Sequence, residues 1–131
     1  MDNNNDKNKE NAIVCKVVLL GESGVGKTCI INRFINDLFS EDEKSSAIPT
    51  FTTKTMEFKE FQGKNVKFEI WDTAGQEKYR ALNKLFYQDA GVAILVYDVT
   101  NKESFEEIQK YWSKQIKEFG LKDISKELHY F

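Results

Sequence analysis

The sequence predicts an α/β fold built on a mostly parallel sheet. Two apolar runs, residues 13–20 and 90–97, have the composition of buried strands, and a glycine-rich loop and a helix-like segment follow the first. Parallel strands that are covered on both faces consist of such continuous apolar runs. With 131 residues, 40% of them hydrophobic, the chain is long enough for one domain with a real core.

Charge and composition argue against several classes of function. The net charge is −2, and lysines are mixed with acidic residues along the whole chain, so the basic patch of a nucleic-acid-binding protein is missing. No run approaches the 18 or so apolar residues that a membrane span requires. Two cysteines, Cys15 and Cys29, provide no disulfide framework. We expect both to be reduced and buried, as in a cytosolic protein.

The two ends of the sequence are polar. Residues 1–11 lack the apolar region of a signal peptide, so we expect a disordered tail there. The last three residues, His129, Tyr130 and Phe131, include no prenylation cysteine. A position in a disordered tail is the simplest interpretation of His129.

The glycine-rich loop is the most informative stretch. Residues 21–28 read Gly-Glu-Ser-Gly-Val-Gly-Lys-Thr, the spacing G-x-x-x-x-G-K-[ST] of a phosphate-binding loop, in the expected order of strand, loop and helix. Its glycines let successive backbone N–H groups turn toward an anion, and the N-terminus of the following helix adds to the attraction. We therefore predict a nucleotide-phosphate site formed by Gly21, Glu22, Ser23, Gly24, Val25, Gly26, Lys27, Thr28 and Cys29.

Five side chains or backbone groups suit triphosphate chemistry. Lys27 would supply charge to the β- and γ-phosphates, and Thr28 would offer a hydroxyl to Mg²⁺, which prefers oxygen ligands. Asp72 ends a strand-like run and would hold the Mg²⁺ from the far side, directly or through water. The N–H of Gly75 would approach the γ-phosphate, and Gln76 would orient an attacking water.

The remaining pattern predicts a helix that ends near Asn36 or Asp37, a long polar loop, and then a β-hairpin. The predicted elements after residue 37 are a loop over 38–49, strands over 51–61 and 66–71 with a turn at 62–65, a helical segment over 78–88, a strand over 90–97 and a helix over 104–119. In the last helix, Ser104 and Glu107 fit a capping box. Its apolar stripe is expected in the core: Phe105, Ile108, Trp112, Ile116 and Phe119.

Trp71 stands out in the second hairpin strand. Val66, Phe68 and Ile70 alternate with polar residues and should face the core, which leaves Trp71 on the other face. Two interpretations stay open from the residues alone. The ring is either covered by its own domain or available to a partner.

The chain resembles the small GTPases of the Ras superfamily, most closely the Rab branch. The resemblance rests on residues 20–28, on residues 66–79 with their Trp-Asp-Thr-Ala-Gly-Gln block, and on residues 96–100. It implies a P-loop NTPase small G domain: a three-layer α/β/α fold with a mostly parallel sheet and one antiparallel hairpin strand. It further implies GTP/GDP and Mg²⁺ as ligands, slow GTP hydrolysis, and a switch that regulates vesicle traffic.

The same resemblance assigns partners and switch segments. Residues 38–51 would be switch I and residues 72–88 switch II, and Phe51, Trp71 and Phe86 match an aromatic triad that Rab proteins present to effectors. Exchange factors and GTPase-activating proteins are further partners that the family implies. A location on the cytosolic face of endomembranes is expected for a full-length family member.

Switch I departs from the Rab pattern. A gap-free match places Ser46 where the family has the threonine that binds Mg²⁺ and the γ-phosphate, and serine keeps the hydroxyl. Pro49 and Thr50 resemble the Pro-Thr pair of other branches, which makes Thr50 a rival ligand. We favour Ser46. The hairpin also looks longer than usual around residues 59–61.

The C-terminal part departs further. The family continues with a fifth strand carrying Asn-Lys-x-Asp, which reads guanine, and residues 122–131 do not match it. We therefore expect an incomplete G domain over residues 12–121, lacking two strands and two helices, with a divergent tail. The fourth strand would then be an exposed edge. One hypothesis is a GTP-hydrolysing switch; the alternative is a non-catalytic fragment that binds nucleotide weakly and keeps only the effector-binding face.

Overall fold

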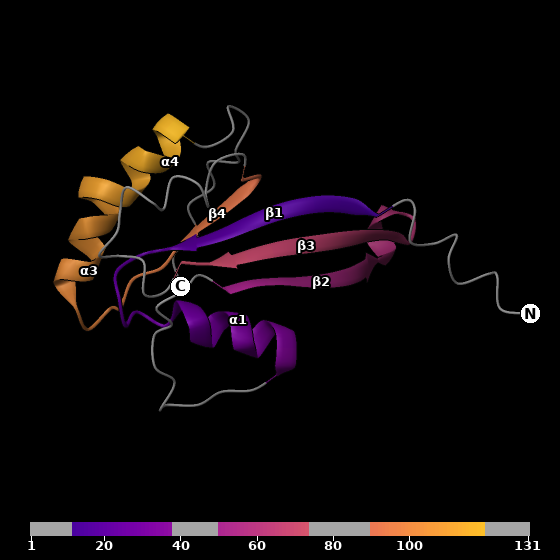
Figure 1. Ribbon diagram of the computed structural model, residues 1–131, viewed down its shortest axis with the longest axis horizontal. Coiled ribbons are helices and arrows are strands. Elements are labelled where there is room, and N and C mark those ends of the chain that lie inside the picture. The colour runs from indigo at the N-terminus through magenta and orange to yellow at the C-terminus, as the bar shows by residue number, and fades with distance from the viewer. Residues whose placement is uncertain (1–11, 38–49, 74–89, 120–131) are drawn as a thin grey trace, which may run out of the picture.

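The computed structural model describes residues 12–37, 50–73 and 90–119. Strands and helices alternate along most of this length, and an antiparallel hairpin interrupts the alternation (Figure 1). In chain order the elements are β1 (Ile13–Leu20), α1 (Lys27–Asn36), β2 (Thr50–Phe58), the 3₁₀ turn η1 (Lys59–Phe61), β3 (Lys64–Asp72), β4 (Val92–Leu95), α3 (Lys102–Glu107), the π-helical turn η3 (Ile108–Trp112) and α4 (Ser113–Phe119).

The described strands form one sheet in the order β2-β3-β1-β4. β1 runs parallel to both of its neighbours, and β2 pairs antiparallel with β3. Figure 1 shows α1 on one face of this sheet and α3 and α4 on the other. The predicted three-layer α/β/α arrangement, with a mostly parallel sheet and one antiparallel strand, is therefore confirmed.

The second half of β1 is the centre of the core because it is covered on both faces, whereas Ile13 and Val14 at its start are exposed, contrary to the expected buried strand. Side chains of a strand alternate between faces, so the two residue pairs of its second half point in opposite directions. Val18 and Leu20 pack with Ile108, Trp112 and Ile116 on the side of α3 and α4. On the side of α1, Val17 and Leu19 pack with Ile31, Ile70 and Val96.

The first strand of the β-hairpin ends earlier than predicted. β2 ends at Phe58, and η1 replaces the last three residues of the strand expected over 51–61. The turn closes through hydrogen bonds from the N–H of Gln62 to the carbonyl of Lys59 and from the N–H of Gly63 to the carbonyl of Phe58, both 3.2 Å long. Gln62 and Gly63, which connect η1 to β3, both have positive φ. β3 is correspondingly longer than predicted.

β4 differs from the expectation of a strand covered on both faces. It spans four residues of the apolar run 90–97 and lies at the edge of the described sheet. Ala93 and Leu95 pack against the core on the side of α3 and α4. Val92 and Ile94 stay 38% and 40% exposed, and Ile31 of α1 packs against residues of β1 and β3 instead. The expected exposed edge is present among the described strands.

The C-terminal helical region begins earlier than predicted. The N-cap is Asn101, whose side chain accepts a hydrogen bond from the Ser104 N–H, so the capping box of Ser104 and Glu107 is wrong. Asn101 and Ser104 are both of a type that caps helices well. Ser104 is buried, with 1% of the residue exposed, and its hydroxyl donates to the carbonyl of Asn101, so Asn101 is the N-cap. Three of the five stripe residues, Ile108, Trp112 and Ile116, lie in the core as expected.

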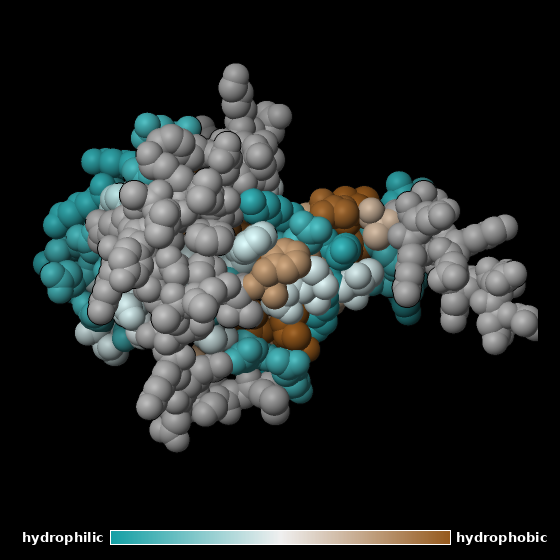
Figure 2. All heavy atoms as spheres, in the orientation of Figure 1, coloured by the Kyte–Doolittle hydropathy of each residue, from teal (hydrophilic) through white to brown (hydrophobic). Residues whose placement is uncertain are grey.

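Hydrophilic side chains lie along the side of α3 and α4 in the view of Figure 2, whereas apolar side chains form small patches near β1 and α1. None of the helices in the described ranges combines the length and the apolar character needed to cross a bilayer.

Candidate phosphate-binding site

The glycine-rich loop connects the carboxyl end of β1 to the start of α1. Its three glycines all have positive φ: 151° at Gly21, 78° at Gly24 and 103° at Gly26. A Cβ on Gly21 would lie 2.2 Å from the carbonyl oxygen of Val96, so no side chain fits there. At Gly24 and Gly26 a Cβ would meet no atom within 4 Å. The backbone is thus bent tightly at its base while the outer turn borders open space.

Lys27 is buried at the centre of this loop. Only 3% of the residue is exposed, and its Nζ donates hydrogen bonds to the carbonyls of Gly21 at 2.7 Å and Glu22 at 2.8 Å. A buried ammonium group needs such partners because desolvating an unpaired charge is costly. The loop therefore holds a positive charge at a fixed place beside its own N–H groups.

Thr28 and Asp72 meet next to this charge. The Thr28 hydroxyl donates to Oδ2 of Asp72 at 2.5 Å, although the two residues are 44 positions apart in the sequence. Asp72 ends β3, which is the parallel neighbour of β1, and it is 2% exposed. Hydroxyl and carboxylate oxygens are the ligands that Mg²⁺ prefers. The residues present thus fit the ion expected from the sequence.

Thr73 is a residue of this region that the sequence analysis missed. Its hydroxyl donates to the carbonyl of Leu19 at 2.6 Å, and the residue is completely buried. This hydrogen bond connects the residue just after β3 to the end of β1, immediately before the loop. No local pattern distinguishes Thr73 from an ordinary surface threonine, because its partner lies 54 residues away.

Other predicted site residues lie outside the described residues. These are Ser46, Gly75, Gln76 and Phe86, together with the helical segment predicted over 78–88. Thr50, the rival of Ser46, is the first residue of β2, and its backbone pairs with Asp72 in the antiparallel register. The choice between Ser46 and Thr50 therefore stays a prediction.

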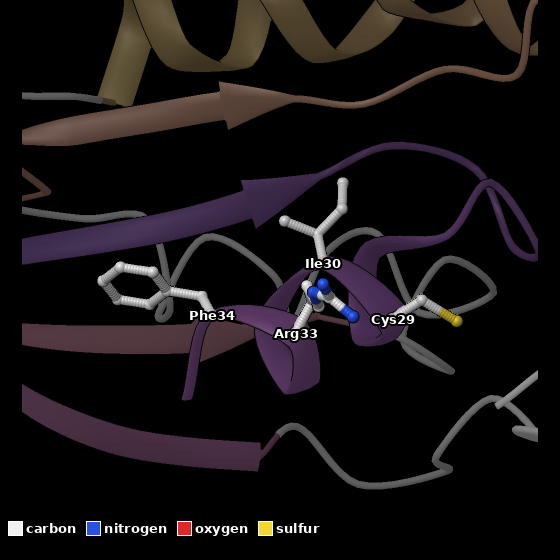
Figure 3. A pocket seen from close by; sticks show the side chains of 4 residues that line it. All are labelled: Cys29, Ile30, Arg33 and Phe34. Atoms are coloured by element: carbon white, nitrogen blue, oxygen red, sulfur yellow. The ribbon is translucent and has the colours of Figure 1, made fainter. Parts of the chain in front are cut away.

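Neither cysteine forms a disulfide with another described residue, and both are half-buried, less than expected. Cys15 packs against the apolar cluster on the side of α1, and burial raises the pKa of its thiol. Cys29 lines an open hollow of about 430 Å³ together with Ile30, Arg33 and Phe34, all from α1 (Figure 3). The side chains around this hollow are mostly apolar, so it does not resemble a phosphate site.

Phe51 and Trp71 form an aromatic pair across β2 and β3. They are directly opposite in the register, and their ring centroids lie 4.7 Å apart. Phe51 is 47% exposed. Trp71 is half-buried and packs against the core on the side of α3 and α4, opposite to Phe68 and Ile70 as predicted. Its own domain covers part of the ring, and part remains accessible.

Comparison with known proteins agrees with this geometry. A model described as the Ras family matches residues 16–128. The chain belongs to the Ras family. Curated relatives include Ras-related protein RGP2 of Oryza sativa subsp. japonica, 42% identical over 88% of the chain, and Ras-related protein Rab2BV of Beta vulgaris, 41% identical over 83%. Ras-related protein Rab-10 of Caenorhabditis elegans is 44% identical over 85% of the chain.

The Rab names of two of these relatives confirm the resemblance to the Rab branch. The matches cover 51%, 49% and 53% of the three relatives, so the chain spans about half the length of the curated proteins it matches. The matched part contains the phosphate-binding loop, Thr28, Asp72 and the aromatic pair.

Proposed function

We propose that this protein is a GTP-binding and GTP-hydrolysing molecular switch of the Rab type. It regulates intracellular vesicle traffic by binding effector proteins in a nucleotide-dependent way, on the cytosolic face of endomembranes. Membership of the Ras family supports this proposal. The observation that carries it is the meeting of the Thr28 hydroxyl with the Asp72 carboxylate beside the buried Lys27.

In the proposed reaction the chain binds and orients the triphosphate. The loop N–H groups and Lys27 stabilise the charge of the β- and γ-phosphates, and catalysis of phosphoryl transfer consists mainly of such positioning and charge stabilisation. Thr28 and Asp72 would hold Mg²⁺, which neutralises phosphate charge when bound. Gln76 orients the attacking water, and the N–H of Gly75 approaches the γ-phosphate. Hydrolysis is slow without a partner, because an arginine finger from an activator typically adds about 10³–10⁵ in rate.

In the proposed switch, the conformation of residues 38–51 and 72–88 would depend on which nucleotide is bound. In the proposed GTP state both segments order around the γ-phosphate, and they are released after hydrolysis. Phe51, Trp71 and Phe86 form the effector surface. The exposure of Phe51 and its contact with Trp71 support this part of the proposal, because aromatic side chains are enriched at the centre of protein interfaces. Exchange factors and GTPase-activating proteins complete the proposed set of partners.

A second candidate function keeps the effector surface without catalysis. The half-exposed Phe51 beside Trp71 favours it, since an accessible aromatic pair is a typical contact surface for a protein partner. In that case the chain would bind nucleotide weakly and act only as a binding module.

Nucleotide content separates the two functions. The chain is purified without added nucleotide and denatured, and the released small molecules are identified by ion-exchange chromatography. The switch predicts about one GDP or GTP per chain, and the binding module predicts none. Lys27→Met is the matched variant, because it removes the buried charge while keeping a long apolar stem; the switch predicts that it loses the nucleotide.

Hydrolysis tests the role of Gln76. Single-turnover GTP hydrolysis is measured with and without an activating protein. We expect Gln76→Leu to slow the activator-stimulated rate by at least tenfold, because the amide that orients water is gone. An unchanged rate in both conditions would show that Gln76 has no catalytic role.

A further inference from the structure

A side chain from the helical layer opposite α1 forms a hydrogen bond with the phosphate-binding loop. The indole N–H of Trp112 donates to Oε1 of Glu22 at 3.2 Å, across 90 positions of sequence. Trp112 is completely buried, whereas Glu22 is partly exposed at the second position of the loop. A buried indole N–H is a donor that needs an acceptor, and a carboxylate is a strong one.

Trp112 stands at the end of an irregular helical turn. η3 (Ile108–Trp112) is π-helical and separates α3 from α4, which together would otherwise form one continuous α-helix. One extra residue in a turn changes the direction in which the following side chains project, and π-turns occur frequently at functional sites. In this chain the π-turn ends on the residue whose indole reaches the loop.

Glu22 connects Trp112 to the buried ammonium group of Lys27. Its side chain binds Trp112, and its backbone carbonyl accepts a hydrogen bond from Nζ of Lys27 at 2.8 Å. Trp112, Glu22 and Lys27 are therefore joined by two consecutive hydrogen bonds. A shift of η3 relative to the sheet would move a carbonyl that holds the lysine.

We propose that Trp112 is a positioning residue of the phosphate-binding loop, and that the helical layer α3–η3–α4 thereby controls how tightly the loop retains a nucleotide. The effect on nucleotide retention rests on the proposed function. The effect on the loop itself does not. A tryptophan that served only as core would need its ring alone, whereas positioning needs the indole N–H and its acceptor on Glu22.

The first measurement reads the hydrogen bond directly. The chain contains two tryptophans, so a ¹⁵N–¹H correlation spectrum of the full chain has two indole signals, with Trp71 as internal reference. We expect Glu22→Ala to shift the Trp112 indole signal and to accelerate its hydrogen exchange, while the Trp71 signal stays in place. Glu22→Gln keeps an acceptor oxygen and should restore most of the protection. Equal exchange of the Trp112 indole in all three proteins would overturn the proposal.

The second measurement asks whether the loop responds. Trp112→Phe removes the N–H and keeps an aromatic ring, and Ile116→Val is the matched control, because Ile116 is buried in the same cluster and makes no polar contact with the loop through its side chain. We expect Trp112→Phe to shift the backbone amide signals of Gly24, Gly26 and Lys27, and Ile116→Val to leave them unchanged. Shifts confined to residues 102–119 in both variants would overturn the proposal. If Trp112→Phe does not fold, the same amide signals are compared in Glu22→Ala and Glu22→Gln.

The third measurement concerns the nucleotide. We expect Trp112→Phe to release a fluorescent GDP analogue roughly fivefold to thirtyfold faster than the unmodified chain, and Ile116→Val to stay within about twofold. Equal release from both variants would overturn the control of retention. If the unmodified chain retains no nucleotide at all, the proposed function fails, and the amide shifts of the loop still decide whether Trp112 positions it.

Discussion

The Thr28 hydroxyl lies 2.5 Å from the Asp72 carboxylate, and these two oxygens come from the start of α1 and the end of β3. Parallel pairing of β1 with β3 produces this contact, because both strands end at the same edge of the sheet. We expect Thr28→Ala and Asp72→Asn each to weaken Mg²⁺-dependent nucleotide retention by roughly 10–100-fold.

The measurement is the release rate of a fluorescent GDP analogue with Mg²⁺ and with a chelator. In the unmodified chain the chelator should accelerate release, whereas in the two variants release should already be fast with Mg²⁺ present. Thr28→Ser keeps the hydroxyl and is the control. A variant that responds to the chelator as strongly as the unmodified chain would contradict the assignment.

Gly21 is expected to tolerate no side chain. A Cβ there would lie 2.2 Å from the carbonyl oxygen of Val96, and φ is 151°. Gly21→Ala should lower the free energy of unfolding by at least about 2 kcal/mol, through backbone strain and overpacking. Gly24→Ala is the control, since its Cβ meets no atom within 4 Å and only strain of about 1 kcal/mol remains. Urea unfolding of nucleotide-free protein measures both.

Thr73 is expected to contribute to stability through a single buried hydrogen bond. Thr73→Val keeps the shape of the side chain but leaves the carbonyl of Leu19 without this donor. We expect a loss of about 1–3 kcal/mol in the free energy of unfolding. Thr73→Ser retains the hydroxyl and should lose clearly less. If valine and serine destabilise equally, packing of the methyl group matters more than the hydrogen bond.

Asp98 should make the fold sensitive to acid. The Thr100 hydroxyl donates to its carboxylate at 2.7 Å and the Thr100 N–H at 2.8 Å, and these hydrogen bonds lower the pKa of Asp98. A carboxyl group whose pKa is lower in the folded state stabilises the fold above its unfolded pKa of about 3.9. That contribution is lost as the pH falls from about 4 through the lowered folded pKa.

The pH dependence is measured by comparing the chain with Thr100→Val, which removes the first of the two donors. The stability difference between the two proteins should be larger at pH 6 than below pH 3, and an NMR titration of the Asp98 carboxyl group should give a higher pKa in the variant. A stability difference that does not change with pH would rule out this origin.

The sequence predicts the loop and the central strand well, because their signals are local. Glycine spacing specifies the backbone of residues 21–28, and a continuous apolar run specifies β1. The N-cap was misassigned because Asn101 and Ser104 are both good caps, and only the buried hydroxyl of Ser104 decides between them. The exposure of Val92 and Ile94 depends on where the helices pack on the sheet, which no pattern within residues 90–97 contains.

Local sequence patterns do not predict contacts between distant residues for the same reason. The hydrogen bonds of Thr73 with Leu19 and of Trp112 with Glu22 join residues 54 and 90 positions apart. The apolar stripe correctly places Trp112 in the core, but the partner of its indole N–H follows from the packing of α3, η3 and α4 on the sheet. The sequence predicts a common site for Thr28 and Asp72 because both belong to motifs of known chemistry, and the structure brings the two side chains into contact.

The second half of β1, residues 17–20, pairs with strands on both edges and is covered on both faces, which has a consequence for motion in the site. Backbone amides of such a strand exchange with solvent only when the whole domain unfolds, whereas edges and surface turns open locally. The loop that follows Leu20 is therefore attached to the slowest-exchanging part of the molecule. We therefore expect this loop to serve as a fixed reference in the proposed switch.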